Sequence, residues 1–176
     1  MRIISGTLKG RRISPPKKLP VRPTTDLSKE SLFNILTNTM DYESCDALDL
    51  FAGTGNISFE LASRGCKRIV SVDKHLLCCK FINETCKALG IETIEVVKSD
   101  VFFFLKNVSE KYDFIFADPP YDLDKIIELP GIVLGNNLLK PDGIFVIEHS
   151  STIKLGLTDR LIDFRKYGQS AFSFFQ

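Results

Sequence analysis

The sequence predicts an α/β fold: a mostly parallel, seven-stranded sheet with helices on both faces and a small N-terminal β-hairpin. Three observations predict it. Short runs rich in β-branched and aromatic residues alternate with longer segments that carry an apolar stripe. A glycine-rich turn follows the first of these runs, and two strand-like segments around Gly168 end the chain. The length of 176 residues fits one domain with a short extension.

The N-terminal part predicts a hairpin followed by a stiff linker. Residues 2–14 alternate loosely around Gly6 and Gly10, which indicates a small hairpin that turns near Lys9 and Gly10. Residues 14–20 contain three prolines and predict an extended segment. We therefore expect an extension over residues 1–22 and the main domain over residues 23–176.

This extension is basic, whereas the rest of the chain is acidic. Residues 1–25 contain seven basic and no acidic side chains, and residues 26–176 contain 16 basic and 22 acidic ones, a balance of −6. A basic arm on an acidic body suits a polyanion, although a solvated tail explains the same charges. Arg22, Thr24 and Asp26 are either linker and cap residues or face a ligand at the edge of the domain.

The main domain repeats a strand–helix order. The apolar stripe of residues 27–40 predicts a helix capped by Thr25 or Asp26. Strands are expected at residues 47–51, 68–72, 93–97, 112–117 and 144–148. Helices are expected at residues 57–64, after Asp73 to about Leu89, at residues 102–105 and at residues 124–134. A turn is expected at residues 138–143. Residues 161–167 and 171–175 predict an antiparallel pair at the edge of the sheet.

Composition excludes several classes of protein. No apolar run approaches the ~20 residues that a membrane span needs, and the first residues lack the apolar core of a secretory signal. A cytoplasmic location is the expectation. Five cysteines without a C-x-x-C pair predict free, buried thiols rather than disulfides or a zinc site, so no metal is expected.

Four residues, Asp118-Pro119-Pro120-Tyr121, mark the end of the strand predicted at residues 112–117. In an open α/β sheet, ligands bind beyond the carboxyl ends of the strands. The first proline biases Asp118 toward extended geometry. A carboxylate, a carbonyl and an aromatic ring thus come together, a set that suits a planar group with an exocyclic amine. A strand that ends in a Pro-Pro turn with an acidic cap is the purely structural alternative.

A glycine-rich turn, Asp49-x-Phe51-Ala52-Gly53-Thr54-Gly55-Asn56, joins the first predicted strand to a helix. Glycine suits a backbone that bends sharply and approaches a ligand. The turn matches the first part of a dinucleotide fingerprint, but Ser58 stands in place of the third glycine. Asp49 would repel a pyrophosphate and attract a cation. The turn therefore favours S-adenosylmethionine (AdoMet), which carries a sulfonium and an amino group and no phosphate.

Two further carboxylates follow the next strands. Asp73 lies 18 residues after Gly55, at the position from which a carboxylate can accept from ribose hydroxyls. Asp100 follows the third strand, where its carboxylate or the Val101 amide could bind an adenine edge. A single carboxylate of this kind is more often a cap or turn residue, but acidic residues at successive strand ends indicate one ligand site.

With these motifs, the chain resembles the RsmD-type small-subunit ribosomal RNA guanine-N2 methyltransferases, a Rossmann-like, AdoMet-dependent family. Asp-Pro-Pro-Tyr with a glycine-rich turn indicates amino-group methylation in general, which adenine-specific DNA enzymes share. The segment Arg-Pro-Thr-x-Asp at residues 22–26 is what narrows the resemblance to the RsmD-type family. Asn56, Ile57 and residues 74–79 depart from the family's pattern. The matching segments run nearly end to end: residues 1–6, 9–11, 22–26, 32–34, 48–55, 64–65, 118–121 and 167–168.

The resemblance implies a class I methyltransferase that transfers a methyl group from AdoMet to the N2 amine of a guanine in 16S ribosomal RNA. The expected partner is a 30S subunit or an assembly intermediate, bound by a monomer, and the expected product is S-adenosylhomocysteine. The implied residues are, for catalysis, Asp118, Pro119, Pro120 and Tyr121; for the cofactor, Asp49, Phe51, Ala52, Gly53, Thr54, Gly55, Asn56, Asp73, Lys74, Asp100 and Val101; and for the substrate, Lys9, Arg11, Arg12, Arg22, Thr24 and Asp26.

Three alternatives come from other classes. An adenine-N6 DNA methyltransferase shares the Asp118–Tyr121 tetrapeptide, but 176 residues leave no obvious DNA target-recognition domain. Ser58 and the absence of an evident hydride-transfer site disfavour an NAD-type oxidoreductase. An intact cofactor turn and Asp118 disfavour a non-catalytic RNA-binding or assembly factor with the same fold.

Overall fold

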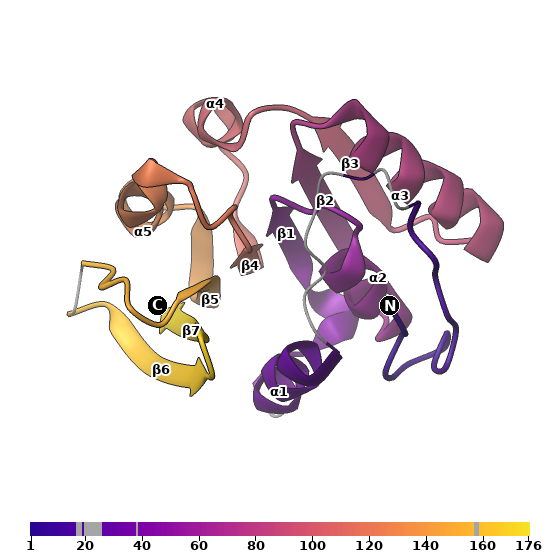
Figure 1. Cartoon of the computed structure of the whole chain (residues 1–176), viewed down its shortest axis with the longest axis horizontal. Coiled ribbons are helices and arrows are strands. Elements are labelled where there is room, and N and C mark those ends of the chain that lie inside the picture. The colour runs from indigo at the N-terminus through magenta and orange to yellow at the C-terminus, as the bar shows by residue number, and fades with distance from the viewer. Residues whose placement is uncertain (17–18, 20–25, 38, 157–158) are drawn as a thin grey trace.

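The structure is a computed structural model of the chain, and it describes residues 1–16, 19, 26–37, 39–156 and 159–176. The seven strands form one sheet in the order β3-β2-β1-β4-β5-β7-β6 (Figure 1). Strands β1 to β5 pair in parallel, whereas β7 pairs antiparallel with β5 and β6, which confirms the predicted sheet. The strands are β1 (Asp46–Leu50), β2 (Arg68–Asp73), β3 (Ile94–Lys98), β4 (Tyr112–Ala117), β5 (Leu139–Ser150), β6 (Leu161–Tyr167) and β7 (Ser170–Phe175).

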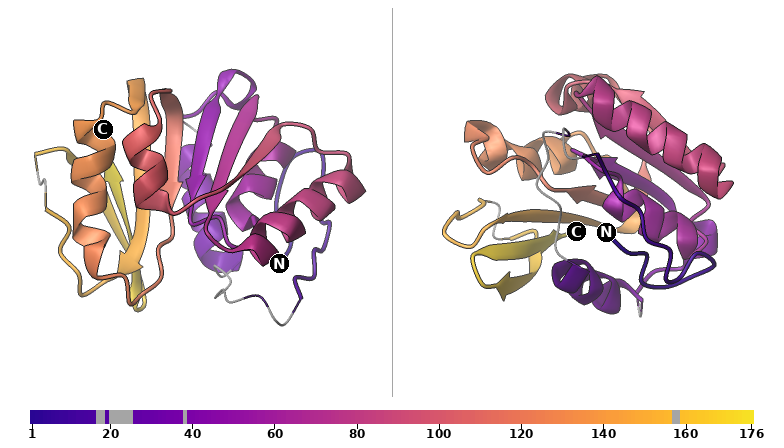
Figure 2. Two further views of the ribbon diagram at one scale, coloured as in Figure 1. Left: turned by 90° about the horizontal axis from the view of Figure 1, so that it is seen from above. Right: turned by 45° about the vertical axis from the view of Figure 1, so that its right-hand side comes forward.

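Helices cover both faces of the sheet. One face, with Leu48 and Leu50, packs against α4 and α5, and the other, with Ala47, packs against α1 and α2. In the left view of Figure 2, α4 and α5 lie in front of the sheet and α1 lies behind it. The helices are α1 (Asp26–Leu36), α2 (Asn56–Ser63), α3 (Leu76–Leu89), α4 (Val101–Asn107) and α5 (Leu129–Gly135), with 3-10 turns η1 (Tyr42–Ser44) and η2 (Asp124–Glu128).

The alternation of side chains along β1 positions the first polar group of the site. Successive side chains of a strand point to opposite faces. Because Leu48 and Leu50 pack beside α4 and α5, the intervening Asp49 lies on the face covered by α1 and α2. Its register partner on β4 is Phe116, which belongs to the core on that same face. The sequence pattern of this strand therefore buries one carboxylate on an otherwise apolar face.

The N-terminal hairpin is looser than the sequence predicts. Arg2 and Arg12 form an isolated antiparallel bridge, and no regular strand precedes β1 among the described residues. Gly6 adopts a φ of 81°, and a Cβ atom there would collide with the backbone carbonyl of Ser63. The chain thus turns at Gly6 as well as at Gly10 and lies directly on α2, where the Thr7 amide donates to the Ser63 carbonyl (2.7 Å). Backbone hydrogen bonds still join the two arms, from the Ile3 amide to the Arg11 carbonyl (3.0 Å) and from the Ile13 amide to the Met1 carbonyl (3.0 Å).

Several element boundaries differ from the prediction, among them the end of α1 and the start of β5. Helix α1 ends at Leu36 instead of residue 40; just after it, the amide (2.9 Å) and the hydroxyl (2.6 Å) of Thr37 both donate to the Phe33 carbonyl. Strand β5 begins at Leu139, so the predicted turn at residues 138–143 is a register irregularity inside the strand. Asp142 keeps the left-handed backbone of a turn, with a φ of 62°.

The predicted state of the thiols is confirmed, since all five cysteines are free and buried. Burial raises the pKa of the Cys78 thiol to about 12 and that of Cys86 to about 11. These thiols are therefore packing groups rather than nucleophiles at neutral pH. Within the described part of the chain, no helix is both long enough and apolar enough to span a membrane.

Candidate active site

A pocket of about 560 Å³ opens at the carboxyl ends of β1, β2 and β4. The strand order reverses between β1 and β4, the point at which open α/β sheets bind ligands. Its volume lies within the usual range for small-molecule sites, roughly 300–1,000 Å³. The pocket gathers most of the predicted site residues: Asp49, Phe51, Ala52, Gly53, Thr54, Asn56, Asp73, Lys74, Asp100, Val101, Asp118, Pro119, Pro120 and Tyr121.

The glycine-rich turn is held in a compact, left-handed conformation. Phe51, Gly53 and Gly55 have φ angles of 59°, 54° and 73°, a region that costs a non-glycine residue free energy. Gly55 does not line the pocket; a Cβ atom there would come within 3.0 Å of the side chains of Ile82 and Phe59. Gly55 is thus needed for the packing of the turn on α2 and α3, whereas Gly53 forms part of the pocket wall.

Asp49 lies at the base of the pocket and is almost completely buried. One carboxylate oxygen accepts hydrogen bonds from the Ser58 hydroxyl (2.5 Å) and the Ser58 amide (3.2 Å). The pKa of Asp49 is raised to about 7, mainly by burial; the hydrogen bonds from Ser58 oppose this shift, and the negative charges of Asp118 and Asp73 add to it. Asp49 therefore changes charge near neutral pH, and a cation in the pocket would favour its ionised form.

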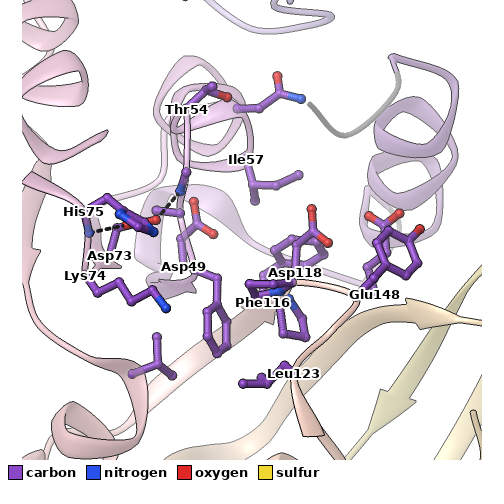
Figure 3. Close-up of a pocket in the computed structure, with 18 of the residues that line it drawn as sticks. Asp49, Thr54, Ile57, Asp73, Lys74, His75, Phe116, Asp118, Leu123 and Glu148 are labelled. Carbon is purple, nitrogen blue, oxygen red and sulfur yellow. Dashed lines mark hydrogen bonds between the residues drawn. The ribbon is translucent and has the colours of Figure 1, made fainter. Parts of the chain in front are cut away.

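Asp73 connects the glycine-rich turn to the start of α3. Its Oδ2 accepts from the Gly53 amide (2.8 Å) and its Oδ1 from the His75 amide (2.7 Å), as the dashed lines in Figure 3 show. Each carboxylate oxygen has a second lone pair, so both can still accept from a ligand. The side chain lines the pocket, where it is pre-oriented for hydroxyl groups.

Asp100 and Val101 form the start of α4. The Asp100 carboxylate caps the helix by accepting from the Phe103 amide (3.1 Å). Asp100 is exposed at the rim, and Val101 is buried in the wall. The first amides of a helix have no partner within the helix, so the Val101 amide can donate to the edge of a ligand, whereas the Asp100 carboxylate can only accept.

The tetrapeptide lies in the same pocket as the glycine-rich turn. Asp118 follows the last residue of β4 and donates its amide to the Leu50 carbonyl (3.4 Å), which keeps it beside the end of β1. Pro119 is buried, whereas the ring of Tyr121 is 49% exposed at the rim. The Tyr121 hydroxyl is 2.7 Å from the Ser170 Oγ of β7. The ring is therefore anchored at its hydroxyl while the rest of its surface stays accessible.

The predicted substrate residues lie away from this pocket or outside the description. Lys9, Arg11 and Arg12 are exposed on the hairpin and do not line it. Arg22 and Thr24 fall outside the described residues, and Asp26 is described only by its backbone, at the start of α1. Of the predicted substrate residues whose side chains are described, Lys9, Arg11 and Arg12 thus lie on a surface apart from the pocket.

Several residues that the sequence did not single out complete the pocket. Glu148, 7% exposed, enters from the end of β5, and Ser28 enters from α1. The sequence could have indicated Glu148 as a pocket residue, because it is an acidic residue at the carboxyl end of a predicted strand, the place where Asp118 also stands. Further residues line the walls: Ile57, His75, Phe102, Phe116, Leu123, Lys125 and Ser170. In the described ranges, no group of three metal-ligating side chains could hold a metal ion.

A buried polar network, also unforeseen, joins the pocket wall to the N-terminal hairpin. Lys29 of α1 is fully buried; its Nζ donates to the Asn56 side chain (2.8 Å) and to the Arg2 carbonyl (2.7 Å) and lies 3.4 Å from Glu60 Oε2. Glu60 accepts three further hydrogen bonds, from the Ile4 amide (2.8 Å), the Ser5 amide (3.0 Å) and Arg64 Nε (2.9 Å). Asn56, which departs from the family's pattern, thus links α1 to the pocket.

The strand order and the placement of the pocket define a class I AdoMet-dependent methyltransferase. The family model described as "Conserved hypothetical protein 95" matches residues 1–176, so the chain belongs to this family, the RsmD-type methyltransferases.

Individual relatives agree with this assignment. The chain is 33% identical to the Bacillus subtilis protein YlbH, over 88% of this chain and 85% of that protein. It is 32% identical to Ribosomal RNA small subunit methyltransferase D of Buchnera aphidicola subsp. Acyrthosiphon pisum, over 83% and 76%. A solved Thermus thermophilus protein has a TM-score of 0.87 at 28% identity, and the match covers 100% of this chain and 99% of that one.

Proposed function

We propose that the protein transfers a methyl group from AdoMet to the exocyclic N2 amine of a guanine in small-subunit ribosomal RNA. One observation carries the proposal: the Asp118–Tyr121 tetrapeptide and the glycine-rich turn line one pocket at the switch point of the sheet. Relatives of similar length named Ribosomal RNA small subunit methyltransferase D support the choice of substrate.

The residues present fit AdoMet, which supplies a methyl group bound to a positively charged sulfur. Asp49 and Asp73 make the inner wall acidic, and the turn offers no lysine to a phosphate. Asp73 would accept from ribose hydroxyls, and the Val101 amide and Asp100 would contact the adenine edge. Ionised Asp49 would attract the positive end of the cofactor, and Lys74 at the rim would contact its outer part.

Asp118 and the Pro119 carbonyl would hold the amine of the target base. The lone pair of a guanine amine is delocalised into the ring, so positioning matters more than removal of a proton. Accurate alignment can supply about 7–11 kcal/mol of barrier lowering. Both acceptors would bind more strongly as positive charge develops on the nitrogen. The exposed ring of Tyr121 would stack on a base turned out of the RNA.

The hairpin over residues 1–22 would bind the RNA backbone outside the pocket. Arg2, Lys9, Arg11 and Arg12 are exposed on it, and no acidic residue lies in this segment. Contacts between such side chains and phosphates weaken as salt rises. The hairpin would therefore provide affinity for RNA, while the pocket would provide the chemistry.

Methyl transfer from tritiated AdoMet tests the proposal, with 30S subunits, assembly intermediates, naked ribosomal RNA and DNA as substrates. We expect label in ribosomal RNA, recovered as N2-methylguanosine after digestion. Label recovered as N6-methyladenine from DNA would support the adenine alternative and refute the proposal. Asp118→Ala should abolish transfer but keep AdoMet binding, whereas Asp122→Ala, which changes an exposed aspartate of the same loop outside the pocket lining, should change little.

A further inference from the structure

Glu148 stands beside Asp118 at the mouth of the pocket. The last residue of β4, Ala117, pairs with Ile147 of β5, so Asp118 and Glu148 are the next residues on two neighbouring strands. Neighbouring strands lie about 4.8 Å apart, which is close to the width of the hydrogen-bonding edge of one base. Figure 3 shows both carboxylates directed into the pocket from these two strand ends.

Alternation along the strands places the two carboxylates on the same face of the sheet. Ile147 packs with α4 and α5, so Glu148 points to the opposite face, as Asp118 does after Ala117. Only 7% of Glu148 is exposed, and the residue lines the pocket, so a bound ligand can reach its carboxylate there. A carboxylate has about four lone-pair sites, so it can accept from a ligand in addition to its contacts within the protein.

The Watson–Crick edge of guanine matches two neighbouring groups that accept hydrogen bonds. Guanine presents its N1–H beside the two hydrogens of its N2 amine. An ionised Glu or Asp only accepts hydrogen bonds. If Asp118 and the Pro119 carbonyl hold the amine, the neighbouring Glu148 is placed to accept from N1–H. Adenine has an acceptor lone pair at N1, which a carboxylate there would repel.

We propose that Glu148 makes the pocket specific for guanine by accepting a hydrogen bond from N1–H next to the reacting amine. The inference rests on the guanine-N2 activity proposed above and assigns a specificity-determining role to a residue outside the Asp118–Tyr121 tetrapeptide. Asp118 and the Pro119 carbonyl alone accept an amine from either purine. Glu148 supplies the contact that distinguishes guanine, because a site built to bind a donor rejects a base that lacks it.

The decisive experiment replaces the target guanine with 2-aminopurine in reconstituted RNA substrate. This base keeps the 2-amine but carries a lone pair in place of the N1 hydrogen. For the wild-type enzyme, kcat/KM should be lower with 2-aminopurine than with guanine on the order of 100-fold. Glu148→Ala should lower kcat/KM for guanine on the order of 100-fold and for 2-aminopurine by less than about threefold, so that the preference nearly disappears.

Two further variants define the effect. Glu148→Gln keeps one acceptor oxygen and should show an intermediate preference for guanine. Glu92→Gln changes an exposed glutamate of the turn before β3, outside the pocket, and should keep the wild-type preference. AdoMet binding and circular dichroism of each variant show that it is folded, and the wild-type comparison of the two bases is independent of any substitution.

Each outcome decides between the two proposals. A wild-type enzyme that methylates guanine but treats 2-aminopurine equally, or a Glu148→Ala enzyme that keeps the wild-type ratio, overturns the role of Glu148 and leaves the guanine-N2 activity intact. A wild-type enzyme that forms no N2-methylguanosine on any substrate overturns the proposed function itself, and the role of Glu148 with it.

Discussion

Breaking the buried ion pair between Lys29 and Glu60 is expected to destabilise the protein more than any surface substitution. Both side chains are fully buried, between the N-terminal hairpin, α1 and α2. Removing one partner of a buried pair leaves an uncompensated charge and typically costs about 3–5 kcal/mol. That is a large fraction of the roughly 5–15 kcal/mol by which a domain of this kind is usually stable.

The two single substitutions should not cost the same. Lys29→Ala leaves Glu60 with its three other donors, so we expect a cost near the lower end, about 3 kcal/mol. Glu60→Ala takes the carboxylate away from the buried Lys29 ammonium and also unpairs the amides of Ile4 and Ser5. Each unsatisfied buried group adds roughly 1–3 kcal/mol, so the cost should reach about 5 kcal/mol or more.

Urea unfolding followed by circular dichroism measures these differences. Arg68→Ala is the matched control, because Arg68 pairs with the exposed Glu95 and Glu110 and should cost below about 1 kcal/mol. The double variant of Lys29 and Glu60 should cost less than the sum of the singles, since neither charge is then stranded. A Glu60→Ala cost no larger than that of Arg68→Ala would refute the account of this network.

Three further predictions concern the pocket. Because the pKa of Asp49 is raised to about 7, mainly by burial, its contribution to folding stability is largest below about pH 4 and is lost as the pH rises through 7. The affinity for AdoMet should instead rise over about pH 6–7.5, as Asp49 ionises. Asp49→Asn should flatten both pH profiles, with stability measured by urea titration and affinity by calorimetry. Asp73→Ala should weaken AdoMet binding at least about tenfold by calorimetry, with a smaller effect on RNA binding. Tyr121→Ala should lower kcat/KM for RNA by roughly 5- to 150-fold, corresponding to about 1–3 kcal/mol of stacking, whereas Tyr121→Phe should keep most activity and so separate the ring from its bond to Ser170.

The sheet and the inner half of the pocket could be predicted from the sequence because both follow local patterns. Apolar runs of five or six residues identified the parallel strands, and the residue after each run lies at one edge of the sheet. Asp73 and Asp118 therefore line the pocket as expected. Gly55 was placed in the cofactor site but packs behind it, because a glycine pattern does not distinguish a ligand contact from tight helix packing.

The contacts that the sequence did not reveal depend on distant segments. Lys29 reads as one polar residue in an amphipathic helix, and its burial follows from contact with Arg2 and Asn56, each 27 residues away. Glu148 lies near the carboxyl end of β5 and Asp118 directly follows β4, and their places side by side depend on β5 pairing with β4. A local sequence pattern does not contain such pairings, so the positions of Lys29 and Glu148 are known only from the tertiary structure.

The same pairings explain why the pocket can be so acidic. Asp49, Asp118 and Glu148 come from three adjacent strands and share the sheet face covered by α1 and α2. Carboxylates that lie close together repel one another when ionised, and the charge of Asp118 is one of the causes that raise the pKa of Asp49, after burial. A sulfonium beside Asp49 and base donors beside Asp118 and Glu148 would each offset one of these charges. The acidity thus favours a cationic cofactor together with a donor-rich base edge, and it disfavours a nucleotide cofactor whose phosphates would add negative charge.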